Sequence, residues 1–256
     1  MTRYRRIIKK MGYLRDQEGI LNRYMRESSQ WKTHLENTRN FINNSFADTH
    51  INSVAVLGSG WLLDIPLSEL ARRFNKIYLV DIWHPPQIRN RVKDIKNIEL
   101  LETDLSGGAV EQLWQITRNK GAIDNSRTTD FFKLYPPLSN IQTDAYISVN
   151  LLNQLDIILC DFLVKYGYFQ QEATDQFRSM IQAFHIEWIK QIPGCIISDI
   201  SETGIDSSGK ESTKTLLYTN LPSGHRSAQW TWEFDTHGTY SPGIRTRMFV
   251  EAVEWA

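Results

Sequence analysis

Two glycines and two aspartates recur at regular intervals in the first half of the 256-residue chain, and their types suit a nucleotide cofactor. Gly58 and Gly60 follow the apolar run 53–57 and would let the backbone approach a bound cofactor. Asp81 ends the next apolar run, where a carboxylate can accept hydrogen bonds from ribose hydroxyls. Asp104 ends the run after that. The series predicts a cofactor site at the carboxyl edge of a parallel sheet.

The glycines by themselves fit two kinds of nucleotide site, and each fit is incomplete. A dinucleotide fingerprint expects its third glycine at position 63, which is Leu63, and a methyltransferase motif expects a glycine at position 62, which is Leu62. Asp104 separates the two, because a dinucleotide fold requires no acid after its third strand, whereas in a methyltransferase-like site that position contacts the adenine amino group. The run 247–255 can supply the terminal antiparallel strand of the methyltransferase topology.

Three parts of the chain carry a resemblance to class I S-adenosylmethionine-dependent methyltransferases: Val54-Ala-Val-Leu-Gly-Ser-Gly-Trp-Leu-Leu-Asp-Ile-Pro-Leu67, Leu79-Val-Asp81, and Asp104. The chain is most similar to an uncharacterised bacterial branch in which the glycine turn leads into an Asp-Ile/Val-Pro/Asp-Leu segment. The resemblance covers residues 30–200 or so. It implies a Rossmann-like sheet with S-adenosylmethionine at the carboxyl ends of the strands.

The resemblance also implies roles for particular residues. The glycine turn would contact the methionine part, Asp81 would hold the ribose hydroxyls, Asp104 with Leu105 would face the adenine, and Asn150 would lie near the transferred methyl group. The expected cofactor-binding residues are Gly58, Ser59, Gly60, Asp64, Asp81, Ile82, Asp104, Leu105 and Asn150.

The chain departs from the family's pattern at three places. Val56 stands where the family often has an acid, Leu62 replaces a glycine, and a polar loop over 201–213 replaces the usual crossover helix after the fifth strand. Asp64 could compensate in part by binding the methionine ammonium group. Alternatively, Asp64 is an acid in the first turn of a helix, where it stabilises the helix dipole.

Methyl transfer requires a nucleophile that is held in line with the methyl group, and a base only where the nucleophile carries a proton. The segment after the expected fourth strand is Ser148-Val-Asn-Leu-Leu-Asn-Gln154, which lacks the Pro-Pro-aromatic signature of base-methylating enzymes. Asn150 and Asn153 could orient an acceptor there, or could cap a helix. His34 could be a base or a substrate contact from an N-terminal helix, or a surface histidine. The candidate catalytic residues are therefore Asn150, Asn153 and His34.

Other polar residues lie near the expected strand ends. Asp199 and Glu202 form a carboxylate pair that could bind a cationic substrate or act as a base. Trp83 and His84 could flank the adenine, or could simply form the turn before a proline pair. No spacing of histidine, cysteine and carboxylate residues indicates a metal site.

The hydrophobic patterns predict an α/β fold: a Rossmann-like, mostly parallel sheet flanked by helices, with a helical N-terminal extension over 1–50 and an antiparallel C-terminal β segment within 51–256. The N-terminal helices are interrupted by Gly12 and Gly19, and a second helix follows Ser28-Ser29. The polar stretch 120–142 is expected to be a long loop. The expected strands are 53–58, 76–81, 97–102, 144–149, 194–198, 215–219, 228–234 and 247–255, and the helices between them are 64–74, 86–93, 108–119, 153–165 and 171–191.

The composition excludes some classes of protein. Lysine plus arginine equals aspartate plus glutamate at 29 each, so no overall charge selects nucleic acid or anionic membrane. No apolar stretch has the length of a membrane span, and the N-terminus lacks the pattern of a secretory signal. Cys160 and Cys195 lie in apolar runs and are expected to be buried, reduced thiols. A cytoplasmic protein without a membrane partner is expected.

These observations predict a methyltransferase that uses S-adenosylmethionine and acts on a small molecule or a peptide. Three alternatives stay open: a binding protein whose pocket is filled by Trp61 and Leu62, an NAD(P)-dependent oxidoreductase with a sixth parallel strand, and an RNA methyltransferase that uses the basic segment 3–26. Nucleic acid is the less favoured partner. The tryptophan-rich tail could form a homo-oligomer interface.

Overall fold

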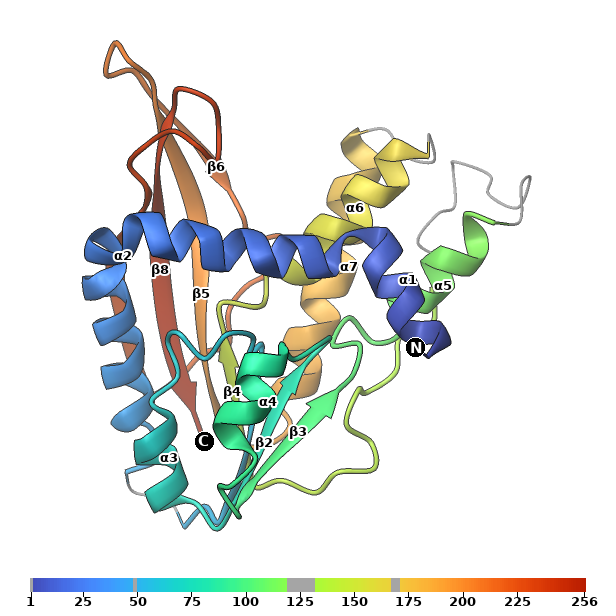
Figure 1. Cartoon of the computed structure of the whole chain (residues 1–256), viewed down its shortest axis with the longest axis vertical. Coiled ribbons are helices and arrows are strands. Elements are labelled where there is room, and N and C mark those ends of the chain that lie inside the picture. Colours follow the sequence, from blue (N-terminus) through green and yellow to red (C-terminus); the bar gives the residue numbers. More distant parts are fainter. Residues whose placement is uncertain (1, 48–49, 119–131, 167–170) are drawn as a thin grey trace.

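The computed structural model of the protein (Figure 1) describes residues 2–47, 50–118, 132–166 and 171–256. Its centre is a single sheet in which the strands are ordered β3-β2-β1-β4-β5-β8-β7. Five consecutive strands in this order pair in parallel: β1 (Ser53–Leu57), β2 (Lys76–Asp81), β3 (Ile98–Glu102), β4 (Ala145–Val149) and β5 (Gly194–Ile205). The strand order reverses between β1 and β4, and in such sheets ligands bind at the carboxyl ends of the strands beside this switch point.

The last two strands complete the sheet, and only β8 runs against the direction of the others on this path. β8 (Arg245–Trp255) lies between β5 and β7 (Arg226–Asp235) and is antiparallel to both. This is the terminal antiparallel strand that the resemblance implies, and the sheet is Rossmann-like. The predicted fold class is confirmed.

The polar stretch 201–213 is not the loop that the sequence suggested. β5 continues to Ile205 and turns into β6 (Glu211–Thr215), which pairs antiparallel with its outer half. The turn is closed by Asp206, whose side chain accepts hydrogen bonds from the backbone of Ser208 and Lys210. All five residues of β6 are exposed, so the hairpin has a polar composition and no apolar alternation. The expected strand 215–219 is correspondingly displaced toward the N-terminus.

Helices cover both faces of the sheet, because the strands direct apolar side chains to each face. Ala55 and Leu57 of β1 belong to the core beneath one set of helices, and Val54 and Val56 belong to the core beneath the other. The first set comprises α1 (Arg3–Met11), α5 (Ala109–Ile116), α6 (Gln154–Lys165) and α7 (Gln171–Ile189), and the second comprises the later part of α2 (Tyr13–Asn43), α3 (Leu67–Arg73) and α4 (Pro86–Val92).

The N-terminal helices break at one of the two predicted glycines. Gly12 has a left-handed φ of 106° and separates α1 from α2, whereas Gly19 lies inside α2 without interrupting it. A kink at Glu27, where φ and ψ are not helical, divides α2 into a first arm and a second arm close to the predicted boundary at Ser28. The first arm (residues 13–26) crosses above the carboxyl ends of the parallel strands, and the second arm runs down beside β8 and α3 (Figure 1).

Several smaller predictions have mixed outcomes. Cys160 and Cys195 are buried and free, as expected. Of the predicted loop 120–142, residues 120–131 lie outside the described part of the chain, and the remainder contains turns but no helix or strand. None of the helices that the structure describes is both long enough and apolar enough to span a bilayer.

Candidate functional site

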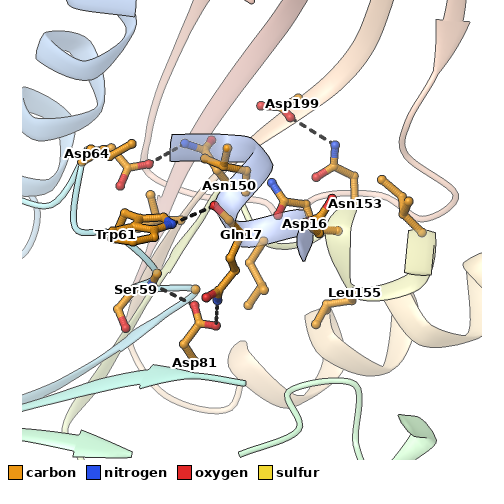
Figure 2. Close-up of a pocket in the computed structure, with 18 of the residues that line it drawn as sticks. Asp16, Gln17, Ser59, Trp61, Asp64, Asp81, Asn150, Asn153, Leu155 and Asp199 are labelled. Carbon is orange, nitrogen blue, oxygen red and sulfur yellow. Dashed lines mark hydrogen bonds between the residues drawn. The ribbon is translucent and has the colours of Figure 1, made fainter. Parts of the chain in front are cut away.

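A cavity of about 410 Å³ opens at the carboxyl ends of the central strands, beneath the first arm of α2 (Figure 2). Volumes of this order are typical of small-molecule and cofactor sites. The predicted residues lie far apart in the sequence, yet the structure brings every one of them to this cavity. The residues concerned are His34, Gly58, Ser59, Gly60, Asp64, Asp81, Ile82, Asp104, Leu105, Asn150 and Asn153.

The turn after β1 needs glycine where the sequence has it. Gly58 has a φ of 81°, and a Cβ atom at this position would lie 2.8 Å from the backbone oxygen of Val149. Leu62 stands where the family has a glycine and still adopts a left-handed φ of 54°. Its side chain is 2% exposed and packs into the core around Val56, not into the cavity. The leucine that replaces this glycine therefore does not block the cavity.

Asp81 is fixed at the end of β2 by three hydrogen-bond donors. The backbone N–H of Gly60 donates to Oδ2 at 2.8 Å, and the backbone N–H of Ile82 donates to Oδ1 at 2.8 Å. The third donor is the side-chain amide of Gln17 on the first arm of α2, which reaches Oδ1 at 2.8 Å (Figure 2). Burial raises the pKa of Asp81 to about 6, while these hydrogen bonds partly oppose the shift.

Asp104 organises the start of α5 as well as lining the cavity. Its Oδ1 accepts hydrogen bonds from the backbone N–H and the hydroxyl of Ser106, and its Oδ2 accepts one from the backbone N–H of Val110 at 3.0 Å. Burial raises the pKa of this carboxyl above its ordinary value. A carboxylate has about four acceptor positions, so Oδ2 can still accept a hydrogen bond from a ligand.

His84 lies beneath the glycine turn and does not line the cavity. Its Nε2 is 2.9 Å from the hydroxyl of Ser59, and its side chain is fully buried. Burial lowers the pKa of His84 to about 4, so the ring is neutral near pH 7. The side chain of Trp83 is packed in the core and is likewise absent from the cavity wall. The expectation that these two residues flank an adenine is therefore wrong.

Asp64 lies in the loop before α3, which begins only at Leu67. The alternative in which Asp64 occupies the first turn of a helix is thus wrong. Its Oδ2 accepts a hydrogen bond from the side-chain amide of Asn150 at 2.7 Å (Figure 2). Asn150 has a left-handed φ of 45°, which asparagine tolerates better than most residues, and this directs the side chain across the end of β4.

Asn153, after β4, and Asp199, within β5 just beyond its pairing with β4, form a second amide–carboxylate pair. The side-chain amide of Asn153 donates to Oδ2 of Asp199 at 3.1 Å. Asn153 precedes α6 but makes no side-chain capping hydrogen bond, so capping does not explain its orientation. Burial raises the pKa of Asp199 to about 6. Glu202, its predicted partner, does not line the cavity and forms an ion pair with Lys214 at 3.2 Å.

His34 is buried, which excludes the surface alternative. The indole N–H of Trp230 donates to its Nδ1 at 3.0 Å, and its ring stacks on Trp232 with centroids 3.9 Å apart. Burial lowers the pKa of His34 to about 3, so the ring is neutral and its single proton must be on Nε2. Because the Nδ1 lone pair is already engaged, the arrangement suits a hydrogen-bond donor better than a base.

Sequence reasoning placed His34 on an N-terminal helix at the site but missed the first arm of α2 and the C-terminal strands. Asp16, Gln17 and Arg23 line the cavity from this arm. Arg23 lies over the rings of Phe234 and Tyr240, with its guanidinium carbon 4.6 and 4.9 Å from their centroids. The helical spacing showed that this segment has a buried face but not what the face covers.

No protein-family model matches the chain, and neither does any curated protein sequence. The chain is similar to a number of solved structures. One is the complex of DhpI with SAH, at 11% identity over 97% of both chains with a TM-score of 0.38. Another is the methyltransferase domain of bacterial CtHen1, at 13% identity over 86% of this chain and 99% of that chain with a TM-score of 0.34. A third is the DhpI–SAM–HEP complex, at 10% identity over 93% and 95% of the chains with a TM-score of 0.35.

Proposed function

We propose that the protein is an S-adenosylmethionine-dependent methyltransferase that acts on a small molecule or a peptide. The observation that supports this most is the convergence of the Gly58–Gly60 turn, Asp81 and Asp104 on one cavity, from the ends of three adjacent parallel strands. The glycine turn suits the methionine part of the cofactor, Asp81 suits the ribose and Asp104 suits the adenine. The same three parts follow one another along the cofactor, as β1, β2 and β3 do along the sheet.

The residues fit the cofactor in chemical type. Gly58 and Gly60 line the cavity without side chains, and Asp81 keeps acceptor capacity on Oδ2 for ribose hydroxyls. Ile82 and Leu105 offer apolar contacts for the adenine ring, next to Asp104. Asp64 and Asn150 offer oxygen atoms for the ammonium group of the methionine part. When bound, S-adenosylmethionine supplies a methyl group that is activated by its attachment to a sulfonium.

The chain's own residues would position the reactants and exclude water. The first arm of α2 covers the cavity and is tied to the glycine turn, because the indole N–H of Trp61 donates to the backbone oxygen of Gln17 at 2.8 Å. The side-chain amide nitrogen of Asn150 lies 3.3 Å from Nε2 of His34, so these two side chains meet at the end of β4, where they can orient an acceptor. Positioning of this kind can provide most of the rate enhancement in a group transfer.

Two observations weigh against the alternatives. The chain turns from β5 into the antiparallel β6, and no helix lies between β5 and β7 among the described elements, whereas the oxidoreductase alternative predicts a crossover to a sixth parallel strand. The binding-protein alternative predicts that Trp61 and Leu62 fill the pocket, whereas Leu62 packs in the core and Trp61 lines a cavity that still measures about 410 Å³.

Calorimetric titration with S-adenosylmethionine, S-adenosylhomocysteine and NAD(H) tests the proposal. We expect the first two to bind at micromolar concentrations and NAD(H) not to bind. The Asp81→Ala variant should lose at least about tenfold in affinity, because it removes a buried acceptor that the ribose requires. Asp94→Ala, at an exposed position outside the cavity, is the matched control and should bind as the wild type does. Binding of NAD(H) alone, or unchanged affinity in Asp81→Ala, would overturn the assignment.

A further inference from the structure

Three buried oxygen atoms, two just after β4 and one in the middle of β5, accept no hydrogen bond from the described residues. They are Oδ1 of Asn150, Oδ1 of Asn153 and Oδ1 of Asp199. The amide groups of the two asparagines are directed to carboxylates, Asp64 and Asp199 respectively, which leaves their carbonyl oxygens free. Buried acceptors without a donor are costly and uncommon in folded proteins. These three line the cavity, so a ligand with several N–H donors would satisfy them.

The charge of the cavity favours the same kind of ligand. Among the described residues that line it, Arg23 is the only lysine or arginine. Its guanidinium group is already stacked on Phe234 and Tyr240 and is close to other carboxylates. The aspartates that line the cavity are Asp16, Asp64, Asp81, Asp104, Asp161 and Asp199. The excess of negative groups attracts a cation and disfavours an anion.

The wall next to Asp199 is aromatic. Trp31, Trp232, Phe234 and Tyr240 line this side of the cavity, and the rings of Trp232 and Phe234 meet edge to face with centroids 4.8 Å apart. Such a wall suits an apolar ligand body, and aromatic faces also stabilise a nearby cation.

We propose that the methyl acceptor is an amine whose nitrogen binds Oδ1 of Asp199 and Oδ1 of Asn153, with its apolar body against this aromatic wall. The proposal rests on the proposed function and names its substrate class. The two sites are separated along the sheet, since the Gly58–Gly60 turn, Asp81 and Asp104 lie at the ends of β1, β2 and β3, whereas Asn153 follows β4 and Asp199 lies within β5, just beyond its pairing with β4.

The reaction balances with the groups at hand. The ammonium form of the acceptor gives one proton to the carboxylate of Asp199, which later releases it to solvent. The free amine then forms a bond from its nitrogen lone pair to the methyl carbon, the bond from that carbon to sulfur breaks, and its electron pair stays on the sulfur. The products are the N-methylated ammonium, S-adenosylhomocysteine and one proton.

The test uses the full chain saturated with S-adenosylhomocysteine. Phenethylamine, propylamine and benzylamine are titrated by calorimetry, in parallel with the neutral 2-phenylethanol and the anionic phenylacetate. We expect at least one amine to bind at least about tenfold more tightly than both comparison compounds, and to be N-methylated, as detected by mass spectrometry, when S-adenosylmethionine replaces S-adenosylhomocysteine. Tighter binding of phenylacetate, or binding of none of the amines to the saturated protein, would overturn the proposal.

The Asp199→Asn variant tests whether Asp199 binds the amine. This variant should weaken amine binding about 10- to 100-fold, because it removes the charge from a buried acceptor, and should leave S-adenosylhomocysteine affinity and the thermal unfolding midpoint close to those of the wild type. Asp94→Asn carries the same chemical change at an exposed site and is the control. An equal loss of S-adenosylhomocysteine binding in Asp199→Asn would assign the oxygen to the cofactor and overturn the proposal. Failure of the wild type to bind S-adenosylhomocysteine would instead overturn the proposed function.

Discussion

At the scale of single residues, burial decides which side chains of the cavity carry charge. The same desolvation that raises the pKa of Asp81 and Asp199 to about 6 lowers the pKa of His34 to about 3. Near pH 7 the aspartates are thus ionised acceptors, while His34 is a neutral donor. Hydrogen-bond acceptors therefore face the proposed cofactor and the proposed amine, and a hydrogen-bond donor lies near the end of β4.

The protonation of His34 can be measured directly. We expect ¹⁵N–¹H spectra of the imidazole rings to show His34 as the Nε2–H tautomer at pH 7.5 and unchanged at pH 5, because its pKa is about 3 and Trp230 donates to Nδ1. The depressed pKa of His34 also makes the free energy of unfolding depend on pH. Between pH 6.5, near the pKa of an unfolded histidine, and pH 3, the unfolded state binds one more proton than the folded state. The contribution of His34 to stability therefore falls as the pH falls through this range.

Exposed histidines provide the comparison within the same spectra. His225, whose side chain is 56% exposed, provides a solvent-accessible ring as the reference. A doubly protonated His34 at pH 5, or an Nδ1–H tautomer, would contradict the proposed hydrogen-bond network.

At the scale of elements, the glycine turn and the hairpin turn offer a matched comparison. Gly58 and Gly209 have nearly the same backbone conformation, with φ of 81° and 82°. A Cβ atom at Gly58 would lie 2.8 Å from a backbone oxygen, whereas one at Gly209 would have no heavy atom within 4 Å. The two positions therefore separate backbone strain from steric overlap.

Alanine substitutions at these two glycines should have different effects. Gly209→Ala should lower the free energy of unfolding by about 1 kcal/mol, through the left-handed conformation alone. Gly58→Ala should cost about 1–3 kcal/mol more, since β4 must shift, and should abolish S-adenosylhomocysteine binding. Denaturant titration and calorimetry measure the two effects. Equal costs, with cofactor binding retained in Gly58→Ala, would show that steric overlap with β4 is not what requires glycine at position 58.

Elements with strong local patterns could be predicted from the sequence, and elements that depend on distant contacts could not. The apolar runs before Gly58 and Asp81 indicated strands because both faces of a central parallel strand are buried. β6 carries no such pattern, because it is fully exposed and is held by its pairing with β5. At the site, the residues that follow strands were predicted. Gln17 and Arg23 were not, because their positions depend on how α2 crosses the sheet.

At the scale of the whole molecule, the first arm of α2 is a roof that joins both halves of the sheet. Gln17 binds Asp81 at the end of β2, and Arg23 lies on rings from β7 and the segment after it. The kink that sets its direction is held from the other end of the chain, since Glu27 accepts a hydrogen bond from the hydroxyl of Thr236 at 2.8 Å.

Cofactor binding should therefore change the dynamics of the roof. We expect S-adenosylhomocysteine to slow amide hydrogen exchange in residues 13–26, because a ligand beneath this arm restricts its opening. The β5–β6 turn, which lies outside the cavity, serves as the internal reference and should exchange at the same rate with and without ligand. Slowed exchange in both segments would indicate general stabilisation. No change in residues 13–26 would contradict the claim that this arm covers the bound cofactor.

The contacts that close the cavity also bear on when it can form during synthesis. The indole of Trp31 donates to the backbone oxygen of Phe234 across 203 residues, and Trp230 reaches His34 across 196. Domains emerge from the ribosome N-terminus first, and pairings of such long sequence separation form slowly. The glycine turn and the early strands will thus be synthesised well before the residues that form the opposite wall of the cavity. The nascent chain will be able to bind ligand only when β7 and β8 have left the ribosome.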